Sequence, residues 1–169
     1  MNFDRSPANR PPWWKVSRGE WLVIGQLALM VLVFFGPRTF DGWRAWASPI
    51  ADGWSIAGCS LMIVGGTLML AGIFRIGRGL TPLPYPKDGA ELVQTGPYAL
   101  VRHPMYCGGF GLALGWALFV QGWLTLGYVA VLFVFLDAKS RREERWLSER
   151  YPAYASYQQR VRKLIPFVY

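Results

Sequence analysis

Four stretches of apolar residues constrain this chain more than any other feature. They cover residues 21–35, 54–74, 105–120 and 123–136, and the segments between them carry nearly all of the Arg, Lys, Pro and acidic residues. A helix needs roughly 20 mostly apolar residues to cross the hydrocarbon core of a bilayer. The pattern therefore predicts an all-α integral membrane helical bundle that forms a single domain over residues 1–169. About four transmembrane helices are expected, at about residues 19–36, 54–74, 104–120 and 123–138.

Composition and charge exclude several other classes of protein. Apolar residues make up 53% of the chain, more than one soluble core requires. The net charge of +8 could suggest a nucleic-acid partner, but the basic residues flank the apolar stretches and form no continuous stripe. His103 is the single histidine, and neither of the two cysteines belongs to a CxxC motif. We therefore expect no nucleic-acid partner and no metal site.

The distribution of Lys and Arg predicts the orientation in the membrane. Sixteen of them lie before the first stretch, between the second and third, or after the fourth, and two lie between the first and second. Positive charge favours the cytoplasmic side. Both termini and the loop before His103 are therefore expected in the cytoplasm, in the inner membrane if the chain is bacterial. The oligomeric state is left open.

Glycines within the apolar stretches predict close helix packing. Gly58, Gly65 and Gly72 recur every seven residues, and Gly111 and Gly115 form a small-xxx-small pair. Such spacing lets helix backbones approach closely in lipid. The third and fourth stretches are expected to form a hairpin at residues 121–122, and whether these short arms fully cross the bilayer is left open.

The third stretch begins with a segment that suits a ligand. Pro104 fits the first turn of a helix, which places His103 at or near the N-cap and leaves backbone N–H groups free for an anion. Gly108 could admit a flat ligand close to the backbone. The alternative is an ordinary interfacial helix start with Tyr106 at the level of the lipid headgroups.

A charged run follows the fourth stretch. Residues 137–145 contain Glu143 and Glu144 together with four cations, Asp137 and Ser140. Aromatic and aliphatic residues follow at roughly helical intervals. We expect residues 139–169 to form an amphipathic cytoplasmic helical segment. Taken alone, the charge run is most simply a solvated, salt-bridged face.

An ordered set of short motifs resembles the isoprenylcysteine carboxyl methyltransferase family and its wider kin, which include phospholipid N-methyltransferases and share a C-terminal region with membrane sterol reductases. The resemblance covers roughly residues 75–167. Its motifs are Gly96-Pro97-Tyr98, the segment from Val101 through Arg102-His103-Pro104-Met105-Tyr106 to Gly108, Glu143-Glu144, Tyr154, Tyr157, Arg160-Val161 and Ile165-Pro166-Phe167.

The resemblance implies a membrane methyltransferase that uses S-adenosylmethionine. It implies a cytoplasmic cofactor pocket with Glu143 and Glu144 closing it. The other residues that it assigns to this pocket are Tyr98, Val101, Arg102, His103, Pro104, Tyr106 and Gly108, with Tyr98 and Val101 on the adenosine side. Family members typically carry an acceptor-orienting arginine four residues before the paired glutamates, where this chain has Lys139. Arg141 and Arg142 stand nearer, so Lys139, Arg141 or Arg142 could take that role, with Glu144 as a further catalytic candidate.

The identity of the methyl acceptor stays open between alternatives. A carboxylate is ionised at neutral pH and needs only a cation to steer it. An amine needs a base, for which His103, Glu143 and Glu144 are the candidates. The surplus of cations near the glutamates favours a carboxylate on a lipidic or prenylated acceptor. The alternatives are a phospholipid amine or another small apolar acceptor, and a non-catalytic membrane scaffold.

Overall fold

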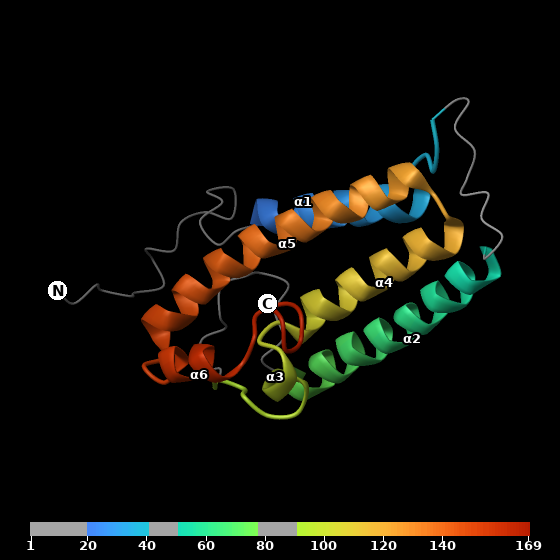
Figure 1. Ribbon diagram of the computed structural model, residues 1–169. Coiled ribbons are helices and arrows are strands. Elements are labelled where there is room, and N and C mark those ends of the chain that lie inside the picture. Colours follow the sequence, from blue (N-terminus) through green and yellow to red (C-terminus); the bar gives the residue numbers. More distant parts are fainter. Residues whose placement is uncertain (1–19, 41–50, 78–90) are drawn as a thin grey trace.

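The described part of the chain is entirely helical. The computed structural model describes residues 20–40, 51–77 and 91–169, and within these ranges it contains six helices and no strand. The helices are α1 (Glu20–Phe35), α2 (Ala51–Ile76), α3 (Pro97–Leu100), α4 (Pro104–Val120), α5 (Trp123–Arg150) and α6 (Tyr154–Arg160). The four long helices form the bundle, and the short helices α3 and α6 lie together at one of its ends (Figure 1).

The sequence predicted the starts and ends of α1, α2 and α4, and the start of α5, to within a few residues, whereas α5 continues twelve residues beyond its predicted end at residue 138. The third predicted helix, 104–120, coincides with α4, and the first, 19–36, matches α1. The second, 54–74, is slightly shorter than α2. The predicted loop before His103 falls partly on residues 78–90, outside the described residues. The prediction of a single domain over residues 1–169 likewise includes segments outside them.

Two of these helices are long and apolar enough to cross a membrane, namely Asp52–Ile76 and Trp123–Arg150, whereas α1 and α4 are shorter apolar helices. The apolar window of the first is only 17% buried within the protein. Large side chains such as Ile63 and Phe74 are 69% and 78% exposed on it. An apolar surface of this extent suits lipid better than water. Helix length and composition thus support an integral membrane protein, and the number of spans and their orientation stay predictions.

The glycines form a seam where α2 meets α4. A Cβ atom on Gly65 would come within 2.8 Å of the Gly108 carbonyl oxygen, and one on Gly58 within 2.5 Å of the Gly115 carbonyl oxygen. Gly72 lies against the Pro104 ring. The packing role predicted for these glycines is confirmed. Because Pro104 opens α4, the seam also fixes where α4 begins relative to α2.

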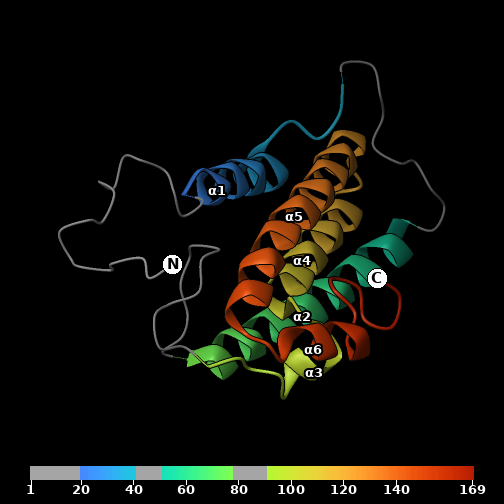
Figure 2. The same cartoon turned by 90° about the vertical axis from the view of Figure 1, so that its left-hand side faces the viewer.

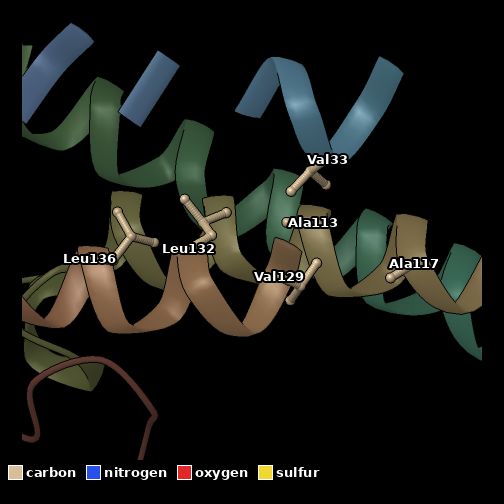
Figure 3. Packing of buried hydrophobic residues seen from close by; sticks show 6 residues of the cluster. All are labelled: Val33, Ala113, Ala117, Val129, Leu132 and Leu136. Atoms are coloured by element: carbon tan, nitrogen blue, oxygen red, sulfur yellow. The ribbon is translucent and has the colours of Figure 1, made fainter. Parts of the chain in front are cut away.

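The remaining face of α4 packs against α5 and α1. The buried core consists of Val33, Ala113, Ala117, Val129, Leu132 and Leu136, which meet between these three helices (Figure 3). Seen from the second direction, α4 and α5 run together while α1 is inclined to them (Figure 2). The predicted hairpin is present, with Gln121 in the left-handed conformation at φ 52° and Gly122 as the N-cap of α5.

The C-terminal segment differs from the expectation. No new element begins at residue 139, because α5 continues without a break to Arg150. The charged run consists of good helix formers, and an (i, i+4) ion pair joins Asp137 to Arg141, so nothing stops the helix before Pro152. Only Tyr154–Arg160 of the remainder is helical, as α6. The prediction of a separate helical segment over 139–169 was therefore wrong in two respects: residues 139–150 belong to α5, and the last nine residues are not helical.

Replacing Gly65 by alanine should weaken the seam between α2 and α4. Its new Cβ would press on the backbone of α4, and overpacking of this kind costs about 1–3 kcal/mol. The adjacent Gly66 is the matched control, since its Cβ would meet only a Leu112 methyl group at 3.6 Å. Thermal unfolding in detergent should show a lower Tm for Gly65→Ala than for Gly66→Ala. Equal Tm values would show that the seam does not limit stability.

Candidate active site

Backbone pairing brings the last part of the chain to the start of α4. The segment after α6 forms an isolated parallel bridge between Val101 and Arg162. The Arg102 amide donates to the Arg162 carbonyl at 2.8 Å, and the His103 amide donates to the Lys163 carbonyl at 3.2 Å. Val101 is fully buried by this pairing. The side chains of Arg102 and His103 thereby face the polar half of α5.

Glu144 is the centre of the resulting cluster. It is 8% exposed, and it lies beyond the apolar half of α5. Arg102 Nε donates to its Oε1 atom at 2.7 Å, and His103 Nε2 lies 3.1 Å from the same oxygen. Gln158 Nε2 donates to Oε2 at 3.2 Å. Because an ionised carboxylate only accepts hydrogen bonds, this contact assigns the proton to His103 Nε2.

These contacts keep Glu144 ionised. Burial raises the pKa of its carboxyl group, but hydrogen bonds from His103 and Arg102 and their charges outweigh burial and lower the pKa to about 2. A lowered pKa means that the cluster stabilises the folded chain fully above the unfolded value of 4.5 and loses this contribution as the pH falls from there toward 2. Glu144 is therefore a negative charge at any physiological pH.

Glu143 forms the second half of the cluster. Its Oε2 atom accepts a hydrogen bond from the Tyr106 hydroxyl at 2.8 Å and lies 3.8 Å from His103 Nδ1. The His103 and Tyr106 rings stack at 5.3 Å with an interplanar angle of 8°. The two glutamates thus contact both sides of one imidazole ring, which is itself at the N-cap of α4.

Arg102 also fastens the C-terminal segment to the cluster. Its Nη1 atom donates to the Gln158 carbonyl at 3.1 Å and to the Val161 carbonyl. The Arg102 guanidinium group therefore joins α5, α6 and the segment that follows α6. Arginine suits this role because its planar guanidinium group carries five N–H donors in a rigid arrangement.

The tyrosines of α3 and α6 form the wall behind the cluster. The Tyr157 hydroxyl donates to the Tyr98 carbonyl at 2.5 Å, and burial with the nearby charge of Glu143 raises the pKa of Tyr98 to about 12. Tyr154 is 1% exposed, and within the described residues its hydroxyl has no hydrogen-bond partner. Burial, followed by the charge of Glu144, raises the pKa of Tyr154 as well. A buried hydroxyl without a partner is costly and suits a site that takes a polar ligand.

The three candidate cations have different surroundings. Lys139 is 3% exposed, donates to Gln26 Oε1 at 2.5 Å, and lies 5.0 Å from the centre of the Tyr106 ring. Arg141 is exposed and binds Asp137. Arg142 is exposed and lies over the Trp146 ring. Of the three, Lys139 alone is buried beside the cluster.

Most of the candidate residues meet at one place, but not all of them do so through their side chains. Arg102, His103, Tyr106, Glu143 and Glu144 are in direct contact, and Tyr98, Val101 and Pro104 are buried around them. Gly108 is different. A Cβ atom there would meet the Gly65 carbonyl oxygen at 2.4 Å and Met69 at 2.7 Å, so α2 fills the space expected for a ligand. Helix packing accounts for this glycine.

An open hollow borders the cluster on the solvent side. It has a volume of about 280 Å³ and is lined by Arg141, Glu144, Arg145, Ser148, Glu149 and Gln158. Through this hollow Glu144 is accessible from the polar half of α5.

Sequence reasoning did not find Gln26, Gln158 and Lys163. Gln158 completes the contacts of Glu144, and Lys163 binds Asp137. Gln26 offered the clearest signal, because an amide within the apolar first stretch needs a partner in a membrane.

Replacing Arg102 by alanine should destabilise the chain and loosen its C-terminal segment. The substitution leaves Glu144 buried beside His103 without its arginine, and breaking a buried ion pair costs about 3–5 kcal/mol. Arg145→Ala, at an exposed position of the same cluster of charges, is the control. Thermal unfolding and limited proteolysis of the last residues check this prediction. Unchanged proteolysis would contradict the fastening role of Arg102.

Comparison with known proteins adds an independent line of observation. Residues 54–154 match the family model described as phospholipid methyltransferase. The protein-S-isoprenylcysteine O-methyltransferase of Saccharomyces cerevisiae is 32% identical over 118 residues, which cover 68% of this chain and 49% of the yeast protein.

Two further relatives are named for resistance to metal ions. The cobalt-zinc-cadmium resistance protein CzcN of Cupriavidus metallidurans is 30% identical over 150 residues, which cover 88% of this chain and 62% of that protein. The nickel-cobalt-cadmium resistance protein NccN of Alcaligenes xylosoxydans xylosoxydans is 26% identical over 149 residues, 88% of this chain and 63% of that protein. The chain thus spans 49% to 63% of the length of these curated relatives.

Because the family model matches more than half of the sequence, the chain belongs to the phospholipid methyltransferase family.

Proposed function

We propose that this protein is a membrane methyltransferase that uses S-adenosylmethionine and methylates a carboxylate on a lipidic acceptor. The observation that carries the proposal is the buried, ionised Glu144 held by Arg102 and His103 at the start of α4. Family membership supports a methyltransferase, and the yeast relative, which is named for O-methylation of isoprenylcysteine, supports a carboxylate acceptor.

The groups around Glu144 fit the polar part of S-adenosylmethionine. Its ammonium and ribose hydroxyl groups need acceptors, which Glu143 and Glu144 provide, and its carboxylate needs donors. Arg102 is a donor in the same cluster, and in the first turn of α4 the N–H groups of Met105 and Tyr106 have no carbonyl partner within their own helix. The Tyr154 hydroxyl, buried without a partner in the described part of the chain, is a further group that a ligand would satisfy.

When bound, this cofactor supplies a methyl group activated by a sulfonium. The chain's own task is then to orient and to exclude water, because a methyl displacement requires the acceptor in line with the methyl carbon. Glu144 and Glu143 would hold the cofactor from α5, beside the stacked rings of His103 and Tyr106. The hollow beside Glu144 is the entry for a water-soluble cofactor.

Lys139 is the residue that we assign to the acceptor. Its ammonium lies beside Tyr106, one helical turn before Glu143 and at the boundary between the apolar and charged halves of α5. A lipid whose chain lies in the bilayer would present its head at this level. A carboxylate there is already ionised and needs only the ammonium to steer it.

A phospholipid amine is the second candidate acceptor, and the description of the family favours it. An amine must lose a proton before it attacks, and Glu143, with 24% of its side chain exposed, is the more accessible carboxylate of the cluster. A buried ammonium at Lys139 would repel such an acceptor, which is why we place the carboxylate first.

Glu144→Gln should weaken cofactor binding. The amide keeps the shape of the side chain but loses the charge, and a hydrogen bond to a charged group contributes about 1.5–3 kcal/mol, which is roughly tenfold to hundredfold in affinity. Isothermal titration of detergent-purified protein with S-adenosylhomocysteine measures the effect. The exposed Glu91→Gln variant is the control. If the wild-type chain fails to bind at high micromolar ligand, it is a scaffold and the methyltransferase proposal is wrong.

Labelled S-adenosylmethionine offered with competing lipid pools distinguishes the acceptors. We expect label in an S-prenylcysteine carboxylate, and label confined to phosphatidylethanolamine derivatives would contradict the carboxylate proposal. Lys139→Met should reduce kcat/KM for the carboxylate roughly tenfold or more, the value of one charge-assisted contact. Arg142→Gln should change it much less, because Arg142 lies over Trp146 and away from the cluster. A larger loss of kcat/KM in Arg142→Gln than in Lys139→Met would show that Arg142, and not Lys139, steers the acceptor.

A further inference from the structure

One buried lysine of the site, Lys139, has no ion-pair partner among the described residues, although Glu143 lies near enough for its charge to act on it. Lys139 and Lys163 are both buried lysines, at 3% and 7% exposure. Lys163 forms an ion pair with Asp137. Within the described residues Lys139 has no carboxylate within ion-pair distance, and its hydrogen bond goes to the neutral amide of Gln26. A buried ammonium without an anion is costly, so this difference points to an anion supplied by a ligand.

Gln26 comes from a helix outside the family match. The match begins at residue 54, whereas Gln26 lies in the middle of α1. Its Oε1 atom accepts from Lys139 Nζ at 2.5 Å. Beside it, a Cβ atom on Gly25 would come within 3.0 Å of the Phe135 ring, so α1 approaches α5 closely at this level. The close approach and the hydrogen bond together fix the Lys139 side chain between α1 and Tyr106.

We infer that Gln26 is a positioning residue which holds the Lys139 ammonium toward an anionic acceptor head, so that α1 forms one wall of the acceptor subsite. The inference rests on the proposed function. It adds that the Gln26–Lys139 pair makes the site prefer an anionic acceptor to a neutral one. A neutral amide is the partner that suits this purpose. It accepts a hydrogen bond and orients the ammonium without neutralising it, whereas a glutamate at the same place would occupy the charge that the acceptor needs.

The alternative contacts of Lys139 do not replace Gln26. Glu143, one turn further along α5, accepts a hydrogen bond from Tyr106. The Tyr106 ring contacts Lys139 only through its face, with Nζ 5.0 Å from the ring centre. Without the amide, the long lysine side chain regains its rotamer freedom and its ammonium is no longer directed.

The test compares affinities for a charged and a neutral probe. The probes are an S-prenylcysteine derivative with a free carboxylate and the matching carboxamide, titrated into protein in phosphatidylcholine nanodiscs saturated with S-adenosylhomocysteine. We expect the wild-type chain to prefer the carboxylate by about tenfold or more, the value of one charge-assisted contact. Gln26→Leu should reduce this preference several-fold. Gln26→Glu should abolish it, although glutamate keeps the shape of glutamine better than leucine does.

Several controls separate the possible failures. Leu27→Ala, at a 60% exposed position on the same helix, should keep the wild-type preference. Lys139→Met should lose it, and adding Gln26→Leu to Lys139→Met should cause no further loss if the two residues act together. Gln26→Leu should lower the Tm, because the buried Lys139 ammonium loses its hydrogen bond. Its S-adenosylhomocysteine affinity should stay close to wild type, which shows that the variant is still folded around the cofactor side.

The outcomes distinguish this inference from the proposed function. If the wild-type chain does not bind S-adenosylhomocysteine, the proposed function is wrong, and the inference that rests on it is wrong too. If it binds S-adenosylhomocysteine but shows no preference for the carboxylate, the carboxylate acceptor and the inference that rests on it are both wrong. If the wild-type chain prefers the carboxylate and Gln26→Glu keeps that preference, only the positioning role of Gln26 is overturned.

Discussion

The buried carboxylate of Glu144 is the contact on which the rest of this end of the molecule depends. Arg102 and His103 hold it from the start of α4, and Gln158 holds it from α6. The same arginine, Arg102, also donates to the carbonyl groups of Gln158 and Val161. It therefore holds the C-terminal segment in place, and that segment in turn covers the Arg102–Glu144 ion pair. Stability and site geometry therefore come from one ion pair, and a change to either partner affects both.

The position of this ion pair is determined by the packing of the apolar helices. Glycines let α2 and α4 approach to backbone contact, and Gly72 receives the Pro104 ring, so the first turn of α4 is fixed against α2. Leu132 and Leu136 fix α5 against the opposite face of α4. The charged half of α5 then extends beyond the apolar core, which brings the paired glutamates level with His103. Apolar packing thus sets the register of a polar site.

The sequence predicted the parts of this arrangement that follow from local pattern. Apolar runs located α4 to the residue, and glycine spacing identified the seam at Gly58 and Gly65. The seam also gives Gly108 a packing role, which the sequence could not distinguish from a ligand-binding role because a glycine that admits a ligand and one that admits a helix have the same local pattern. The link between Gln26 and Lys139 joins residues that are far apart in the sequence and could not be read from spacing. The same holds for the return of Arg162 to Val101.

We place the acceptor at Lys139 because, in the described part of the chain, it is the buried lysine without an ion-pair partner. Arg141 and Lys163 share Asp137, whereas Lys139 is buried beside a neutral amide. The proposed cofactor side has the opposite character, with two carboxylates and a tyrosine hydroxyl that lacks a partner in the described residues. A cryo-EM structure of the chain in nanodiscs with S-adenosylhomocysteine tests this account most directly. We predict that the ligand's polar groups lie within hydrogen-bond distance of Glu144 and of the first turn of α4. A ligand bound away from both would contradict it.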